Sequence, residues 1–220
     1  MNEFPEDILD RLAQGGVVAG FSVENPDHAV PLAKALLAGG IDAIELTLRT
    51  PAGMEALKRI CAGVPEMLVG VGTILTPETV VQVKEAGADF GVAPGMNPRV
   101  VRAAQDAGLP FAPGISTPSE LEAAIELGCR FVKFFPAEAA GGVPYLRSMA
   151  APYKHLGIQY FPLGGLHAEN MVDYLKEDHV PTIGGSWIVK KDLVENEDWA
   201  GLTARAAEVR KIINEGVSDV

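Results

Sequence analysis

The stretch Arg130-Phe131-Val132-Lys133-Phe134-Phe135-Pro136 has the pattern of a strand with two apolar faces. Side chains alternate between the two faces of a strand, so Phe131, Lys133 and Phe135 share one face. The other face carries Val132 and Phe134. Apolar residues on both faces are typical of a parallel strand that is buried on both sides. The stretch therefore favours an α/β fold built on a parallel sheet.

Lys133 is the unusual residue of this strand. A lysine is costly to bury as a cation, and burial favours the neutral, nucleophilic amine. A neutral amine is what a lysine needs to form a Schiff base with a carbonyl compound. The alternative is a lysine at the strand end whose ammonium group extends to solvent. The strand by itself leaves both interpretations open.

A second stretch, Ala43-Ile44-Glu45-Leu46-Thr47-Leu48-Arg49, alternates strictly between apolar and polar residues. It lies between two helical patterns, so both faces of its sheet are expected to be covered, and Glu45, Thr47 and Arg49 should point into a barrel or cleft. A carboxylate there can transfer protons, and a guanidinium can bind a substrate carboxylate through two hydrogen bonds. A structural Glu45–Arg49 ion pair is the alternative, and the two roles are compatible.

Strand and helix patterns alternate along the whole chain. Strands are predicted at residues 17–22, 43–48, 67–72, 89–93, 110–112, 131–134, 158–162 and 181–183. Amphipathic helices are predicted between them, for example at residues 27–38, 51–61, 77–86, 98–107 and 118–127. Four of these helices should begin at an N-cap residue followed by proline, namely Thr50, Thr76, Asn97 and Thr117.

Two further helices are expected at the ends, one at residues 5–14 and one at residues 199–214, with a tail at 215–220. Eight strands that alternate with helices in 220 residues predict a (β/α)₈ TIM barrel with an extra N-terminal helix. No linker or shift of composition divides the chain, so a single barrel domain over residues 1–220 is predicted. A doubly wound open sheet is the alternative.

The composition argues against several classes of partner. The formal net charge of −11 disfavours nucleic acid and anionic membrane surfaces. Two cysteines, Cys61 and Cys129, make no disulfide framework and indicate buried thiols in a cytosolic protein. The acidic first seven residues lack the apolar region of a signal peptide. We therefore expect a cytoplasmic protein that acts on a small molecule.

Unusual residues gather where the predicted strands end, which is where barrels of this type carry their active sites. Thr73 follows the third strand, and the turn Pro94-Gly95 follows the fourth. The pairs Gly164-Gly165 and Gly184-Gly185, the second continued by Ser186, follow the last two strands. Barrels often bind phosphate in these two loops through backbone N–H groups, so a phosphate site is predicted there.

Metal chemistry is not expected. The four histidines, His28, His155, His167 and His179, are scattered without the spacing of metal ligands. His28 is expected on the surface of a helix, and His167 at an exposed helix start. No Gly-x-Ser-x-Gly motif is present, which disfavours a serine hydrolase.

Five motifs together resemble the 2-keto-3-deoxy-6-phosphogluconate (KDPG) aldolase family, which includes 4-hydroxy-2-oxoglutarate (KHG) aldolases. They are Glu45-Leu-Thr-Leu-Arg-Thr50, Gly70-Val-Gly-Thr73, Pro113-Gly-Ile-Ser-Thr117, Lys133-Phe-Phe-Pro-Ala-Glu138 and Gly184-Gly-Ser-Trp187. The resemblance implies a class I aldolase of the Entner–Doudoroff pathway that needs no metal or cofactor. It also implies a (β/α)₈ barrel and a homotrimer.

The resemblance also implies a role for each candidate residue. Lys133 would form the Schiff base, and Glu45 would be the general acid and base. The pyruvyl carboxylate would be held by Arg49, Thr73, Pro94 and Gly95, and Phe135 would pack on the pyruvyl group. The phosphate would be bound by Gly164, Gly165, Gly184, Gly185 and Ser186.

Two departures from the family pattern leave the exact sugar acid open. Many members carry an arginine in the first strand, where this chain has Val18-Ala-Gly-Phe-Ser22. Phosphogluconate enzymes typically have threonine before the first glycine pair, where this chain has Leu163. By the resemblance, Leu163 would lie beside the substrate. An aldolase for the galactonate epimer is therefore an alternative. A phosphosugar isomerase or epimerase with Glu45 as its base, and a non-catalytic phosphosugar-binding barrel, are further alternatives.

Overall fold

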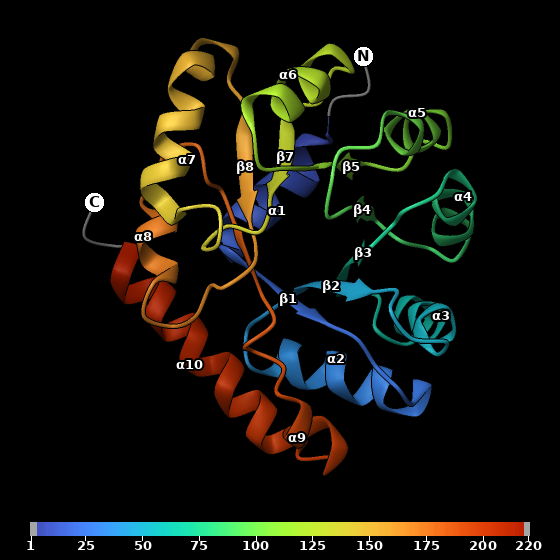
Figure 1. Ribbon diagram of the computed structural model, residues 1–220. Helices are drawn as coiled ribbons and strands as arrows, with labels where there is room; N and C mark the ends of the chain where they lie inside the picture. Colours follow the sequence, from blue (N-terminus) through green and yellow to red (C-terminus); the bar gives the residue numbers. More distant parts are fainter. Residues whose placement is uncertain (1–3, 218–220) are drawn as a thin grey trace.

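The computed structural model describes residues 4–217, and its strands form the inner layer, with helices packed around the outside (Figure 1). The strands are β1 (Val17–Phe21), β2 (Ala43–Thr47), β3 (Leu68–Gly72), β4 (Phe90–Val92), β5 (Phe111–Ala112), β6 (Gly114–Ile115), β7 (Phe131–Phe134), β8 (Gln159–Pro162) and β9 (Ile183–Gly185). The longer helices are α1 (Glu6–Gly15), α2 (Ala29–Ala38), α3 (Gly53–Gly63), α4 (Pro77–Glu85), α5 (Pro98–Asp106), α6 (Pro118–Glu126), α7 (Gly142–Ala150) and α10 (Trp199–Val217). Shorter helical segments are η1 (Pro26–His28), η2 (Ala151–Leu156), α8 (Met171–Leu175) and α9 (Lys191–Glu195).

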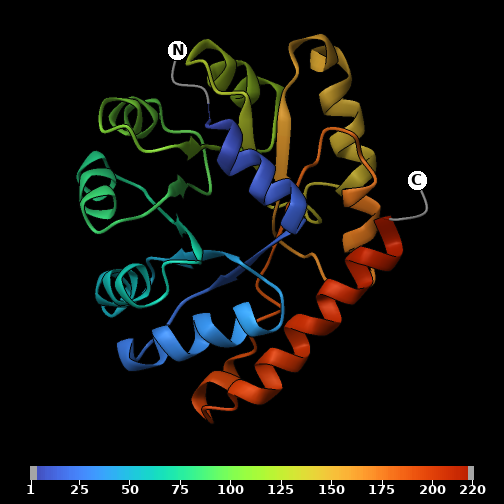
Figure 2. The same ribbon diagram turned by 180° about the vertical axis from the view of Figure 1, so that it is seen from behind.

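Every strand pair in the described part of the chain is parallel. Six strands follow the order β5-β4-β3-β2-β1-β9, and three more follow the order β6-β7-β8. Neighbours in space are mostly neighbours in the chain, without the reversal of order that marks a doubly wound sheet. The sheet is strongly curled, with the helices on its convex side (Figures 1 and 2). The prediction of an α/β fold with a parallel sheet is therefore confirmed.

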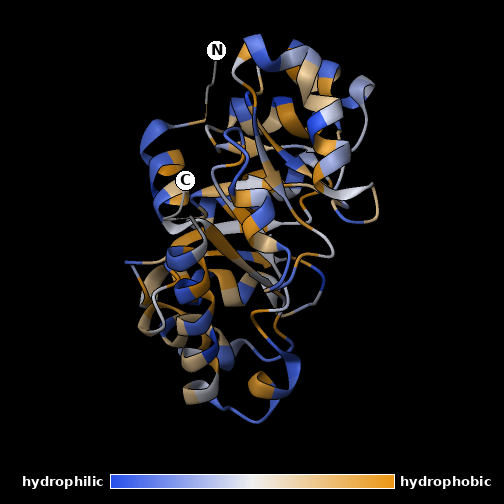
Figure 3. Cartoon of the chain, turned by 90° about the vertical axis from the view of Figure 1, so that its left-hand side faces the viewer, coloured by the Kyte–Doolittle hydropathy of each residue, from blue (hydrophilic) through white to orange (hydrophobic). Residues whose placement is uncertain are grey.

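The alternation of side chains divides the core into two layers. On β7, Val132 and Phe134 belong to the cluster between the sheet and the helices, whereas Phe131 lies in a second cluster inside the curl. Phe131 stacks on Phe161 of β8 there, with ring centroids 5.8 Å apart. The strands in the middle of the molecule are accordingly hydrophobic, and hydrophilic residues lie mainly on the outer helices and loops (Figure 3). The two apolar faces predicted for β7 are confirmed.

Helix α1 covers one end of the curl. It lies across the strands in Figure 2, and its Leu12 is completely buried in the inner cluster. Phe4, just before this helix, makes an edge contact with Phe131 at 4.8 Å between ring centroids. Phe131 is the first residue of β7, so α1 closes the end where the strands begin. The opposite end, where the strands finish, is left for a site.

Most helix starts follow the sequence prediction. Thr76, Asn97 and Thr117 each accept a hydrogen bond at their N-cap from a backbone N–H, as predicted. Thr50 does not, because α3 starts after Ala52. The Thr50 hydroxyl instead donates to the carbonyl of Val23 at 2.6 Å, which ties the end of β2 to the chain after β1.

The structure corrects three details of the predicted element boundaries. The strand predicted at 110–112 is β5, and an additional short strand, β6, follows Pro113, which has no N–H for a continuous ladder. The last strand was predicted at 181–183 but spans Ile183–Gly185, so Gly184 and Gly185 lie in β9 and not in the loop after it. Helix α10 continues to Val217, so part of the predicted tail is helical, and residues 218–220 lie outside the described range. No helix within residues 4–217 is both long and apolar enough to cross a membrane.

Candidate active site

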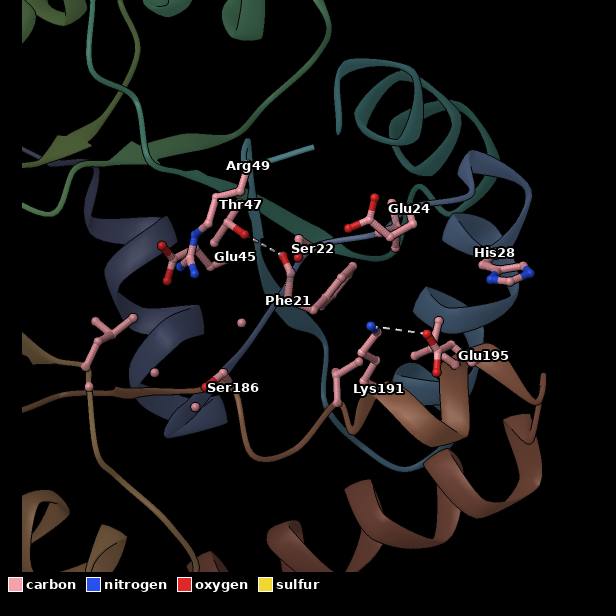
Figure 4. Close-up of a pocket in the computed structure, with 18 of the residues that line it drawn as sticks. Phe21, Ser22, Glu24, His28, Glu45, Thr47, Arg49, Ser186, Lys191 and Glu195 are labelled. Atoms are coloured by element: carbon pink, nitrogen blue, oxygen red, sulfur yellow. Dashed lines mark hydrogen bonds and ion pairs between the residues drawn. The ribbon is translucent and has the colours of Figure 1, made fainter. Parts of the chain in front are cut away.

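A cavity of about 440 Å³ opens where the strands end, opposite α1. Its walls come from the ends of β1, β2, β7, β8 and β9 and from the loops that follow them. Of the predicted site residues, nine lie in its lining: Glu45, Arg49, Lys133, Phe135, Leu163, Gly164, Gly184, Gly185 and Ser186. Several of them are labelled in Figure 4. Residues separated by up to about 140 positions in the chain are thus brought into one hollow.

Lys133 and Glu45 meet across the inside of the curled sheet. The amine Nζ donates to Oε1 of Glu45 at 2.9 Å, and the side chains are only 7% and 3% exposed. Lys133 lies inside β7 and not at a frayed end, so the interpretation of a lysine that reaches solvent is wrong. A buried amine in contact with one carboxylate can exchange a proton with it while both stay out of bulk water.

Gly72 makes room for the Glu45 carboxylate, and the sequence analysis did not single it out. A Cβ atom at Gly72 would lie 2.0 Å from Oε1 and 2.9 Å from Cγ of Glu45. A real Cβ cannot approach so closely, so any side chain at position 72 would displace the carboxylate from Lys133. Glycine as the last residue of a strand pattern was the available signal, because glycine in a strand often marks the close approach of another group.

The polar face of β2 points into the cavity, as predicted. Thr47 is buried and donates to the carbonyl of Phe21 at 3.1 Å, which joins the ends of β2 and β1. Arg49 lies at the mouth beside Thr47 (Figure 4) and makes no ion pair within residues 4–217. The alternative of a structural Glu45–Arg49 ion pair is therefore wrong, because Glu45 pairs with Lys133 instead. The Arg49 guanidinium remains available to an anionic ligand.

An apolar wall surrounds the amine. The Phe135 ring centroid lies 5.3 Å from Nζ of Lys133. Leu163 is 7% exposed and packs over Gly184, where a Cβ would come within 2.4 Å of the leucine side chain. The close approach of Leu163 explains why β9 carries glycine at this position.

Four predicted residues are not part of the cavity lining, namely Thr73, Pro94, Gly95 and Gly165. Thr73 follows β3 with a φ of 65°, a conformation that is unusual for a β-branched residue and occurs where the surroundings impose it. Gly114 packs so closely against the backbone of Pro94 that a Cβ at position 114 would not fit. None of these four residues lines the cavity that holds Lys133, although Gly165 directly follows the lining residue Gly164.

The first glycine pair presents donors for an anion. Gly164 and Gly165 have φ angles of 97° and 84°. Within the described chain, the backbone N–H groups of Gly164, Gly165 and Leu166 have no acceptor. Consecutive free N–H groups in such a turn form a concave site for an anion. The Ser186 side chain lies on the same cavity, with its residue exposed to solvent.

The outer part of the cavity was missed by the sequence analysis. It is lined by Phe21, Ser22, Val23, Glu24, Asn25, His28, Val189, Lys191, Val194 and Glu195. Lys191 pairs with Glu195 at 3.3 Å on the rim, as Figure 4 shows. His28, expected on a helix surface, is half-buried at the end of η1, with its side chain 18% exposed and its ring in edge contact with Trp199. These residues come from the end of β1, from η1, from α9 and from the adjoining segments, and no pattern in the sequence marks them as part of a site.

No group of three or more histidine, cysteine, aspartate or glutamate side chains within residues 4–217 is arranged to hold a metal ion. His167 is exposed, as predicted for a residue at a helix start. The chemistry of the cavity is therefore that of an amine, a carboxylate, a guanidinium and backbone donors.

Residues 8–205 match the sequence model of the aldolase family described as KDPG and KHG aldolase. The chain belongs to this family. The resemblance of the five motifs is thereby confirmed. Within the aldolase family, the chain is 43% identical over 197 residues to the KHG/KDPG aldolase of Escherichia coli K12, covering 90% of this chain and 92% of that one. It is 38% identical over 213 residues to the 2-dehydro-3-deoxy-phosphogluconate aldolase of Haemophilus influenzae, covering 97% of this chain and 100% of that one.

A solved member of the aldolase family has the same fold. The KDPG aldolase of Legionella pneumophila superposes with a TM-score of 0.86 at 36% identity, over 90% of this chain and 95% of that one. Its structure contains pyruvate captured at low pH as a covalent carbinolamine intermediate. A carbinolamine is the product of an amine attacking a ketone, which is the chemistry that a buried lysine can perform.

Proposed function

We propose that this protein is a class I aldolase that cleaves KDPG to pyruvate and glyceraldehyde 3-phosphate. The same site would cleave 4-hydroxy-2-oxoglutarate to pyruvate and glyoxylate. The observation that carries the proposal is the buried amine of Lys133, 2.9 Å from the Glu45 carboxylate in a cavity large enough for a sugar acid. Membership of the aldolase family and the carbinolamine in the Legionella relative support it.

In this proposal Lys133 is the nucleophile. Its neutral amine attacks the C2 ketone of the keto acid, and loss of water from the carbinolamine gives a protonated imine. The imine accepts the electron pair of the C3–C4 bond when the C4 hydroxyl loses its proton. The aldehyde then leaves, and an enamine of pyruvate remains on the lysine. Protonation of the enamine at C3 and hydrolysis of the imine release pyruvate and the free amine.

Glu45 moves the protons of this sequence. It already accepts a hydrogen bond from Nζ of Lys133, so it can take the proton that makes the amine nucleophilic. The same carboxylate, directly or through a water molecule, would accept the C4 hydroxyl proton and return one to C3. Phe135 beside the amine would pack on the pyruvyl group and keep water away from the imine.

Recognition of the two ends of the substrate would use different elements. The pyruvyl carboxylate would be held by Arg49, with Thr73 and the Pro94-Gly95 turn approaching once substrate is bound. The phosphate would lie against the free N–H groups of Gly164 and Gly165 and the hydroxyl of Ser186. Gly184 and Gly185 would contribute mainly space, because both lie in β9.

The quaternary structure and the barrel are part of the same proposal. We expect the curled sheet to be a closed (β/α)₈ barrel in which β5 and β6 form one interrupted strand, since β8 also contacts β9. Residues 1–220 would form this single barrel domain. The protein would act as a homotrimer in the cytoplasm, without a metal or cofactor.

A second candidate substrate is the galactonate epimer, 2-keto-3-deoxy-6-phosphogalactonate. Leu163 favours it, since a leucine in the cavity lining cannot bond the C4 hydroxyl of the gluconate epimer. A phosphosugar isomerase that uses Glu45 alone would need no covalent contact with Lys133.

One assay separates an aldolase from an isomerase. Purified protein is incubated with KDPG, its galactonate epimer or 4-hydroxy-2-oxoglutarate, and released pyruvate is measured with lactate dehydrogenase and NADH. We expect pyruvate from all three, unchanged by EDTA. Rearrangement of a phosphosugar without pyruvate release would favour the isomerase. Loss of cleavage in EDTA, restored by zinc, would contradict the metal-independent mechanism.

A further inference from the structure

The loop with the first glycine pair is held by its carbonyl groups. The carbonyl of Leu163 accepts from the N–H of Ala137 at 2.8 Å, and that of Gly164 accepts from the N–H of Glu138 at 3.0 Å. The carbonyl of Gly165 accepts from the side-chain amide of Asn170 at 3.4 Å. Three consecutive carbonyls are thus bonded to the surrounding protein, while the neighbouring N–H groups stay free.

Glu138 is the central contact of this arrangement. Besides its backbone bond to Gly164, its side chain lies against Gly165, where a Cβ would come within 2.6 Å of the Glu138 Cβ. The segment that contains Glu138 begins at Phe135, directly after β7, so Glu138 lies five positions after Lys133 in the chain. A shift of Glu138 would accordingly move the glycine loop relative to the amine.

Tyr174 fixes the Glu138 side chain. Its hydroxyl donates to Oε1 of Glu138 at 2.5 Å, and the tyrosine is 1% exposed. Burial and the hydrogen bond to Glu138 raise the pKa of Tyr174, so its hydroxyl keeps its proton and remains a donor. Tyr174 lies on α8, the helix that the glycine loop leads into. The bond therefore joins the helix after the loop to the segment after β7.

We propose that the Glu138–Tyr174 hydrogen bond positions the Gly164-Gly165 loop for the phosphate group of the substrate. Tyr174 and Glu138 are positioning residues and do not contact the substrate. The inference rests on the proposed function and deepens it, because it assigns a residue pair to the recognition of phosphorylated substrates. The hydrogen bonds hold the carbonyl groups of the loop against the surrounding protein, so the free N–H groups of the loop point toward the anion.

A phosphate-specific role has a consequence that a general structural role lacks. KDPG has a phosphate for the loop to bind, and 4-hydroxy-2-oxoglutarate has none. Loss of the Tyr174 hydroxyl should therefore weaken the binding of KDPG and leave the binding of 4-hydroxy-2-oxoglutarate unchanged. Pyruvate occupies only the Lys133 end of the cavity, so its trapping on the amine should also be unaffected.

The test is the variant Tyr174→Phe, which removes one oxygen and leaves the ring in its buried place. The matched control is Tyr153→Phe, because the Tyr153 hydroxyl also donates to a glutamate, Glu122, at 2.8 Å. For Tyr174→Phe we expect KM for KDPG to rise roughly ten- to 150-fold, the range for a hydrogen bond to a charged group. KM and kcat for 4-hydroxy-2-oxoglutarate should stay within about twofold, as should all constants of the control.

A second pair of variants keeps the test independent of the folding of Tyr174→Phe. Glu138→Gln retains an oxygen that can accept from Tyr174, so it should keep most of the affinity for KDPG. Glu138→Ala removes the acceptor and should lose most of the affinity for KDPG. Trapping of pyruvate by borohydride should be unchanged in both Glu138 variants.

Equal losses on both substrates, or a KM for KDPG that neither Tyr174→Phe nor Glu138→Ala changes, would overturn the inference while the proposed function stands. A wild-type protein that cleaves neither substrate would overturn the proposed function itself.

Discussion

Nζ of Lys133 and Oε1 of Glu45 lie 2.9 Å apart, although the two residues are 88 positions apart in the chain. They come from β7 and β2 and meet inside the curled sheet, with both side chains almost completely buried. Each neutralises a charge that would be costly to bury alone. The pair therefore combines a structural need with the two groups that imine chemistry requires.

Replacement of Glu45 by glutamine tests its role in proton transfer. Glu45→Gln keeps the shape and an oxygen for Lys133 but cannot accept a proton. Turnover should fall roughly 10²–10⁴-fold if Glu45 is the general base. Steady-state kinetics and thermal unfolding are measured together. Unchanged turnover with a lower melting temperature would mean that Glu45 only neutralises the buried lysine.

Gly72→Ala should misplace the Glu45 carboxylate without replacing any charged residue. The new Cβ would overlap Oε1 of Glu45, so we expect kcat to fall on the order of 10²-fold. Gly15→Ala is the control, since a Cβ there meets only an ordinary contact at 3.4 Å. Circular dichroism checks the fold of both variants. Full activity of Gly72→Ala would contradict the described position of Glu45.

Leu163 should determine how well the enzyme separates the C4 epimers. Leu163→Thr introduces a hydroxyl into the cavity, and one neutral hydrogen bond changes selectivity roughly two- to tenfold. We expect the ratio of kcat/KM for the gluconate and galactonate epimers to rise toward gluconate. Leu163→Val is the control, because valine has the shape of threonine without its hydroxyl. The same ratio in both variants would mean that Leu163 acts only by packing against Gly184.

The two thiols should react slowly in the folded protein. Burial raises the pKa of Cys129 to about 11, so at pH 8 only about one thiol in a thousand is ionised. Alkylation of Cys129 by iodoacetamide, followed in a Cys61→Ser background, should accelerate about tenfold for each pH unit between 8 and 10. It should also accelerate strongly in urea. A rate at pH 8 equal to that of an unfolded chain would contradict the burial of Cys129.

Sequence periodicity predicted much of this fold for a physical reason. The strands are short and apolar, and glycine or proline marks most of their ends, so their positions differ from the prediction by only a few residues. Proline at 113 and the glycines at 184 and 185 blurred the remaining boundaries, because neither residue type favours a regular strand.

The inner part of the site was also predictable, since Lys133 interrupts an apolar strand and Glu45 lies on the polar face of an alternating one. The outer part was not. Phe21, His28 and Lys191 reach the cavity from the end of β1, from η1 and from α9, and the relative placement of these elements depends on tertiary contacts. The hydrogen bond between Glu138 and Tyr174 likewise joins residues 36 positions apart, and nothing in the local sequence indicates it.

The most direct test of the account is trapping of the imine on Lys133. The protein is incubated with pyruvate and sodium borohydride, its intact mass is measured, and the modified peptide is identified by tandem mass spectrometry. We predict one reduced pyruvyl group per chain, on Lys133, and no adduct on Lys133→Ala. No adduct on the wild-type protein, or the same adduct on Lys133→Ala, would contradict the assignment of Lys133 as the Schiff-base residue.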